Sequence, residues 1–110
     1  MSTAGSPDRD QRPPGTTIDT VIVHRISLPP ERFQGDAVER LFTNTLDHAA
    51  HPWFERLRGV QVSAHLLVRR HGGVLQFVSC EQRAWHAGQS RLLGRERCND
   101  FSIGIELEGC

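Results

Sequence analysis

The sequence has little cysteine, no excess of either charge and no long apolar run. Three cysteines among 110 residues, without a C-x-x-C pair, do not form a disulfide framework or a structural zinc site. Thirteen basic residues balance 13 acidic ones, so electrostatics gives no case for nucleic acid or an anionic membrane as a partner. No run is long enough to span a bilayer, and the polar start lacks a secretory signal. Thiols without a signal predict a cytoplasmic protein without membrane insertion.

A chain of this length forms one domain at most. Residues 1–17 are polar and rich in proline, which predicts a disordered leader, with the folded domain over 18–110. Apolar periodicity in that domain predicts a strand over 20–23 that stops at Pro29 and Pro30, a helix over 36–46, a short helical piece over 51–57, a hairpin of 63–70 and 74–78, and a strand over 101–107. A helical crossover together with a hairpin predicts an α/β fold with a mixed sheet.

Two residues within strands have the strongest chemical potential. His24 ends the first apolar run, where a rigid neutral imidazole serves as a metal ligand, a general base or a simple hydrogen-bonded cap. Glu106 lies in the last strand, whose alternation puts Ser102, Gly104 and Glu106 on one face. If that face is covered, desolvation raises the pKa of Glu106 and suits it to general base catalysis; if it is exposed, Glu106 is ordinary. Glu108 on the same face weakens the case that Glu106 is special.

Loop residues give weaker signals. Trp85 and His86 form an aromatic pair in a loop, and such residues either contact ligands or pin the loop to the core. Arg97 either binds a substrate carboxylate through two nitrogens or is a surface charge.

The other histidines are predicted to have structural roles. His65 is expected to pack in the interior and His71 to lie in a turn. His48 and His51 are three residues apart, which is a weak metal signal, and Pro52 indicates a helix end there instead.

Four separated segments resemble the AmpD-type 1,6-anhydro-N-acetylmuramyl-L-alanine amidases, which share a fold with peptidoglycan-recognition proteins. They read VIVHRISLPP at 21–30, VSAHLLVRR at 62–70, RAWHAG at 83–88 and GRERCNDFSIGIELEG at 94–109, within a similarity that extends over 18–110. The resemblance implies a mixed central sheet flanked by helices and one catalytic zinc held by two histidines and an aspartate. It also implies a cytoplasmic role in peptidoglycan recycling on anhydromuropeptides, and a monomer is expected.

The resemblance assigns a role to each candidate residue. His24 matches the first zinc ligand, and Glu106 matches the catalytic acid/base. Arg97 falls where the family contacts the peptide stem, and Trp85 with His86 falls at the substrate groove.

The match also departs from the family pattern. The remaining zinc ligands and a catalytic lysine of the family come later than Cys110, so the domain is predicted to be partial, with its C-terminal part missing. Arg25 replaces an expected asparagine, and Gln61 stands where an arginine often binds the peptide. Three hypotheses follow: a zinc-dependent amidase, a non-catalytic peptidoglycan-binding module and an inactive truncated fragment. The presence of both His24 and Glu106 favours ancestry from an active enzyme.

Overall fold

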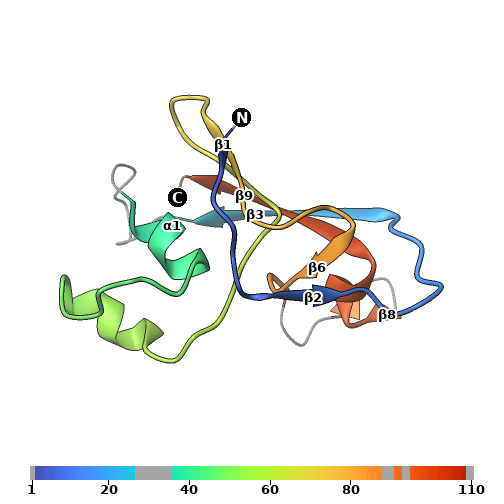
Figure 1. Cartoon of the computed structure of the whole chain (residues 1–110), viewed down its shortest axis with the longest axis horizontal. Helices are drawn as coiled ribbons and strands as arrows, with labels where there is room; N and C mark the ends of the chain where they lie inside the picture. Colours follow the sequence, from blue (N-terminus) through green and yellow to red (C-terminus); the bar gives the residue numbers. More distant parts are fainter. Residues whose placement is uncertain (1, 27–35, 88–90, 93–94, 109–110) are drawn as a thin grey trace.

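A five-stranded mixed sheet forms the centre of the protein. The structure is a computed structural model and describes residues 2–26, 36–87, 91–92 and 95–108. The sheet has the order β1-β5-β4-β9-β3 (Figure 1). Its strands are β1 (Ser2–Thr3), β3 (Thr20–Ile26), β4 (Leu66–Val68), β5 (Val74–Gln76) and β9 (Ser102–Glu108). Since β9 runs parallel to β3 and β4 while β4 and β5 are antiparallel, the predicted mixed sheet and hairpin are confirmed.

The parallel pair of β3 and β9 is the longest in the sheet, with seven residues in each strand. Its register runs from Thr20 opposite Ser102 to Ile26 opposite Glu108. Both strands alternate in burial, because side chains of a strand point to opposite faces in turn. The predicted final strand over 101–107 is thus confirmed. The expected proline stop at 29–30 lies outside the described residues.

A helical layer packs on one face of the sheet. Helix α1 (Ala37–Phe42) and the 3₁₀ helix η1 (Pro52–Leu57) lie together on one side of the strands (Figure 1). Buried side chains of α1 and η1 share a core with those of the sheet and adjoining loops: Val38, Leu41, Phe42, Leu46, Phe54, Ala64, Leu67, Phe77, Val78 and Ala84. The helix predicted over 36–46 is shorter, because Asn44 adopts a positive φ of 60° that ends the helical path.

The N-terminal segment is folded, and the predicted disordered leader over 1–17 is corrected. Strand β1 pairs with β5, and strand β2 (Arg9–Gln11) pairs antiparallel with β6 (Gln82–Ala84). The Ser6 hydroxyl donates a hydrogen bond to the Phe42 carbonyl, and Asp8 is only 1% exposed. The polar composition of this segment predicts disorder wrongly, because hydrogen bonds to backbone groups of the domain hold the segment in place.

Arg12 and Arg83 fasten this segment to the 3₁₀ helix η2 (Cys98–Asp100). Arg12 Nη1 donates to the carbonyl oxygens of Asn99 and Asp100, each at 3.1 Å, and its Nη2 donates to the Cys80 carbonyl at 2.9 Å. Arg83 binds the carboxylates of Asp10 at 2.6 Å and Asp100 at 2.7 Å. The N-terminal segment therefore holds the loop that precedes β9.

The opposite face of β3 and β9 exposes apolar side chains. Val21 is 58% exposed, Val23 is 55% exposed and Leu107 is 36% exposed. An apolar sheet surface of this kind is one that another element or a partner commonly covers. Short strands β7 (Arg91–Leu92) and β8 (Arg95–Glu96) complete the described elements. Every helix in the described ranges is too short or too polar to cross a bilayer.

Replacing Arg12 by alanine is expected to lower the free energy of unfolding by about 2 kcal/mol or more, since hydrogen bonds from a charged donor to three carbonyls are lost. Urea denaturation measures the loss. Arg9→Ala is the matched control, because Arg9 lies on the same strand segment with an exposed side chain. Equal midpoints for the Arg12→Ala and Arg9→Ala chains would contradict an anchored N-terminal segment.

Candidate active site

His24 and Glu106 are neighbours across the β3–β9 pair. The register places His24 directly opposite Glu106. Partners in a parallel pair point to the same face, and adjacent strands lie about 4.8 Å apart. The two side chains therefore leave the sheet side by side, on the face that also carries Leu67, the partner of Glu106 on β4. The register therefore brings together the two residues that the sequence singles out within strands.

The Glu106 carboxyl group is buried without a hydrogen bond that would stabilise its charge. Glu106 is only 7% exposed, and its Oε2 has no hydrogen-bond partner among the described residues. Because burial penalises the charged form, desolvation raises the pKa of Glu106 to about 7. A carboxyl group in this state can take up or release a proton near neutral pH.

Glu108, on the same face, is held quite differently. Its Oε2 lies 3.1 Å from Arg69 Nη2, and its Oε1 accepts the backbone N–H of Arg70 at 3.2 Å. Arg69 also reaches Glu39 on α1 at 3.3 Å, so Glu108 takes part in tying the sheet to the helix. Strand alternation alone puts the two glutamates on one face, whereas the structure pairs Glu108 with an arginine and leaves Glu106 Oε2 without a partner among the described residues.

His86 sits on the same face in contact with His24. Its Nδ1 lies 3.4 Å from His24 Nε2, and the ring packs so closely over Gly104 that a side chain at position 104 would overlap it. Asn99 Oδ1 accepts the backbone N–H groups of His86 at 3.2 Å and Ala87 at 2.8 Å. The loop is thereby fixed, and the ring is held over the strand.

Hydrogen bonding fixes the tautomer of His86. The Ser102 hydroxyl donates its only proton to the Cys98 carbonyl. Toward His86 Nε2, which lies 3.1 Å away, Ser102 Oγ can therefore act only as the acceptor. His86 therefore carries its proton on Nε2 and turns the lone pair of Nδ1 toward His24. Burial and then the neighbouring His24 lower the pKa of His86 to about 4, so this ring is neutral at pH 7.

His65 is the packed structural histidine that the sequence predicts. It is fully buried, its Nδ1 accepts the Gly104 N–H at 3.0 Å, and its Nε2 donates to the Gln82 carbonyl at 2.8 Å. Both ring nitrogens are used, and burial lowers its pKa. His71, the predicted turn residue, accepts the Gly73 N–H within the hairpin turn.

Trp85 and Arg97 stand apart from this cluster. The Trp85 carbonyl accepts a hydrogen bond from the Ser63 N–H at 2.9 Å, and the Trp85 N–H donates to Ser63 Oγ at 3.0 Å. These two bonds hold the Trp85 loop against the domain. Arg97 is exposed and precedes η2 with a left-handed φ of 55°. No hydrogen bond or ion pair within the described ranges joins either residue to His24 or Glu106.

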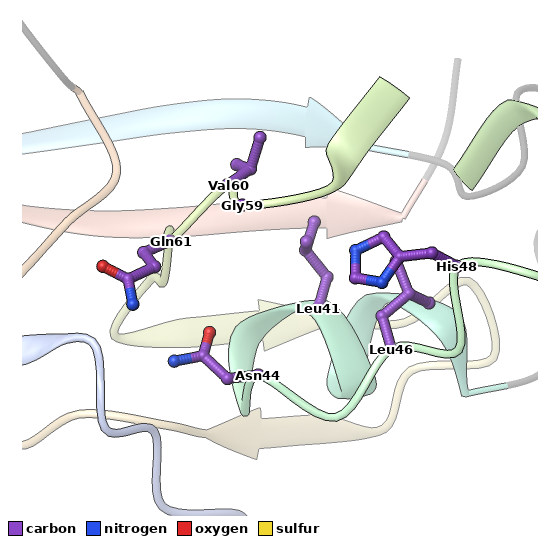
Figure 2. A pocket seen from close by; sticks show the side chains of 7 residues that line it. All are labelled: Leu41, Asn44, Leu46, His48, Gly59, Val60 and Gln61. Atoms are coloured by element: carbon purple, nitrogen blue, oxygen red, sulfur yellow. The ribbon is translucent and has the colours of Figure 1, made fainter. Parts of the chain in front are cut away.

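A separate hollow of about 190 Å³ lies beside α1, and its lining does not include His24 or Glu106. Figure 2 shows Leu41, Leu46 and His48 at one end and the amides of Asn44 and Gln61 at the other. His48 thus belongs to this hollow, while the ring of His51 lies against Phe54 with centroids 5.4 Å apart. The two histidines do not form a shared site.

The donor set fits zinc in chemical type but is incomplete. Imidazole nitrogens and a carboxylate are ligands that zinc accepts, and His24 Nε2 faces the Nδ1 lone pair of His86. No group of three histidine, cysteine, aspartate or glutamate residues in the described part of the chain could hold a metal ion.

The sequence missed the residues that seat His86. Alternation along β9 predicts that Ser102 and Gly104 share the face of Glu106, but nothing in the sequence indicates that a loop histidine packs on them. The sequence gives no indication of the role of Asn99, because that role arises only when the 85–87 loop packs against η2 in the folded chain.

The pKa of Glu106 generates a prediction on stability. In the folded state Glu106 keeps its proton up to about pH 7, whereas in the unfolded state it releases that proton near pH 4.5. The folded state thus binds more protons in this window, and its free energy of unfolding falls as pH rises from about 4.5 to about 7, by about 3 kcal/mol in total. Glu106→Gln removes this loss, so the variant should match the parent at pH 4.5 and exceed it at pH 8.

Urea denaturation with a chelator present, at several pH values, tests this expectation. Glu81→Gln, at an exposed position, is the control and should follow the parent curve. If the Glu106→Gln and parent curves stay parallel from pH 4.5 to 8, Glu106 is not a desolvated carboxyl group.

Curated relatives share both the sequence and the fold. The 1,6-anhydro-N-acetylmuramyl-L-alanine amidase AmpD of Escherichia coli (strain K12) is 55% identical over 104 residues, which are 94% of this chain and 57% of that protein. AmpD of Citrobacter freundii is 54% identical over 94% of this chain and 56% of its own length. A crystal structure of a selenomethionine derivative of AmpD matches with a TM-score of 0.95 at 52% identity, covering 98% of this chain and 60% of that one.

The chain therefore spans a little more than half the length of the curated relatives it matches. The family described as N-acetylmuramoyl-L-alanine amidase matches residues 14–110. This range includes β3, β9 and the neighbouring histidines His24, His65 and His86. With this match and the likeness to AmpD in sequence and in fold, the chain belongs to the N-acetylmuramoyl-L-alanine amidase family.

Proposed function

We propose that the complete domain to which this chain corresponds hydrolyses the amide bond between 1,6-anhydro-N-acetylmuramic acid and the L-alanine of the stem peptide. The names of the relatives support the bond and the substrate class. The observation that carries the proposal is the buried, unpartnered carboxyl group of Glu106 beside His24. Zinc dependence and a cytoplasmic role in peptidoglycan recycling are part of the same proposal.

Glu106 is the proposed general base and acid. With a pKa of about 7, a large share of its carboxyl groups is ionised at neutral pH and can accept a proton from an attacking water. The same carboxylic acid then returns a proton to the departing amine. His24 is the proposed metal ligand, and zinc bound there would polarise the scissile carbonyl and lower the pKa of a coordinated water.

Arg97, Trp85 and His86 are the proposed substrate contacts. The exposed guanidinium of Arg97 is available for a carboxylate of the stem peptide. Trp85 is half-buried, and an indole suits stacking against a sugar ring. The contact of His86 with His24 supports a position close to the reacting bond.

A non-catalytic peptidoglycan-binding module and an inactive fragment are the competing proposals. A buried carboxyl group without a hydrogen bond costs stability, and a module that only binds has no need for it. The unpartnered state of Glu106 therefore favours the enzyme.

A chimera tests the activity. Residues 1–110 are joined to the segment of the Escherichia coli relative that lies beyond the match, and release of free stem peptide from anhydromuropeptide is followed by chromatography. The chimera should be active and chelator-sensitive, whereas the 110-residue chain alone should show no useful turnover. Glu106→Gln in the chimera should keep bound zinc but lower kcat by about a hundredfold or more.

Glu81→Gln in the chimera is the matched control, with kcat unchanged. A Glu106→Gln chimera with full kcat would contradict the role of Glu106. Turnover that resists the chelator would contradict the zinc mechanism, and robust turnover by the 110-residue chain would contradict the need for the rest of the domain.

A further inference from the structure

Arg12 joins three segments that are far apart in the sequence. Its Nη1 donates to the carbonyl oxygens of Asn99 and Asp100, each at 3.1 Å, and its Nη2 donates to the Cys80 carbonyl at 2.9 Å. Arg12 itself comes directly after strand β2. One guanidinium group therefore links the N-terminal segment, the loop after β5 and the end of η2.

The three carbonyls set the position of the guanidinium at a cost to Arg12. Its Nε is buried and has no hydrogen-bond partner among the described residues. A buried donor without a partner costs stability, and the planar guanidinium offers its donors only in a fixed fork. An arrangement with this cost is commonly retained where the placement of neighbouring segments matters for function.

Asn99 carries the position of η2 on to the loop of residues 85–87. Its Oδ1 accepts the backbone N–H groups of His86 at 3.2 Å and Ala87 at 2.8 Å, and Asn99 is only 9% exposed. Both bonds lie where the His86 ring packs over Gly104. Because Arg12 holds the carbonyl of Asn99, a displacement of η2 would also displace this loop.

Glu106 is held in place by other contacts. It lies within β9, which is paired with β3 on one side and with β4 on the other. Arg83 binds the Asp100 carboxylate at 2.7 Å and so secures η2 independently. Removal of Arg12 should therefore move the 85–87 loop while Glu106 stays within its strand.

We propose that Arg12 is a positioning residue for substrate binding, which acts through Asn99 to place the loop that carries Trp85 and His86. This inference rests on the proposed function only in taking Trp85 and His86 as contacts for the muropeptide. The N-terminal segment then takes part in substrate binding, although its composition alone predicts disorder.

Amide hydrogen exchange in the 110-residue chain tests this path without substrate. Arg12→Ala should accelerate exchange of the His86 and Ala87 N–H groups by about tenfold or more, relative to the His65 N–H, which is bonded to the Gly104 carbonyl at 2.9 Å. Arg12→Lys keeps the charge but lacks the fork of donors, so it should act in the same direction. A purely structural role would accelerate all three amides by the same factor.

Asn99→Ala completes a double-mutant cycle. If Arg12 acts through Asn99, adding Arg12→Ala to Asn99→Ala should change exchange at His86 and Ala87 little further. Arg9→Ala, at an exposed position of the same segment, is the control and should leave exchange unchanged. Equal acceleration at all three amides in a folded Arg12→Lys chain, or effects of the two substitutions that add, would overturn the proposal.

The chimera gives the second readout. Arg12→Lys should raise KM for anhydromuropeptide by about threefold or more and leave kcat within about twofold, because the loop binds substrate while Glu106 reacts. A lower kcat at unchanged KM would overturn the proposal and leave the amidase proposal standing. An inactive parent chimera would remove the amidase proposal alone, since the exchange measurements need no substrate.

Discussion

The parallel pairing of β3 with β9 is the constraint on which the site depends. It places His24 opposite Glu106 on one face of the sheet, and it leaves Val21 and Val23 on the other. A side chain in a strand can reach only one face, so a slip of one residue would move the histidine or the glutamate to the wrong side. Arg12 and Arg83 secure the chain just before β9 begins, which connects the N-terminal segment to the register of the site.

Desolvation gives this face its chemistry. Glu108 is buried against Arg69 and takes part in packing the sheet, while Glu106 is buried without a partner and has a raised pKa. The same dry surroundings keep His86 neutral. One sheet face therefore combines a carboxyl group that exchanges protons near neutrality with a neutral imidazole. These properties arise from burial more than from residue identity.

The sequence predicts what local periodicity controls and misses what loops bring together. Alternation in β9 places Glu106 on a defined face, and the hairpin of β4 and β5 follows from its glycine turn. The early end of α1 depends on the left-handed conformation of Asn44, and the order of 2–17 depends on hydrogen bonds from Ser6 and Arg12 to distant carbonyls. The approach of His86 to His24 joins residues 62 positions apart, which no local pattern encodes.

Engineered disulfides test the register of β3 and β9 most directly. Val23 and Ile105 are partners on the exposed face, and adjacent strands bring Cα atoms within the range that a disulfide accepts. A chain with Val23→Cys and Ile105→Cys should form that bond in high yield on mild oxidation, as identified by peptide mapping. Val23→Cys with Ile103→Cys should not. Efficient bonding of the second pair in place of the first would mean a register shifted by two residues, which would separate Glu106 from His24 by about 6.6 Å along the strand and contradict the account.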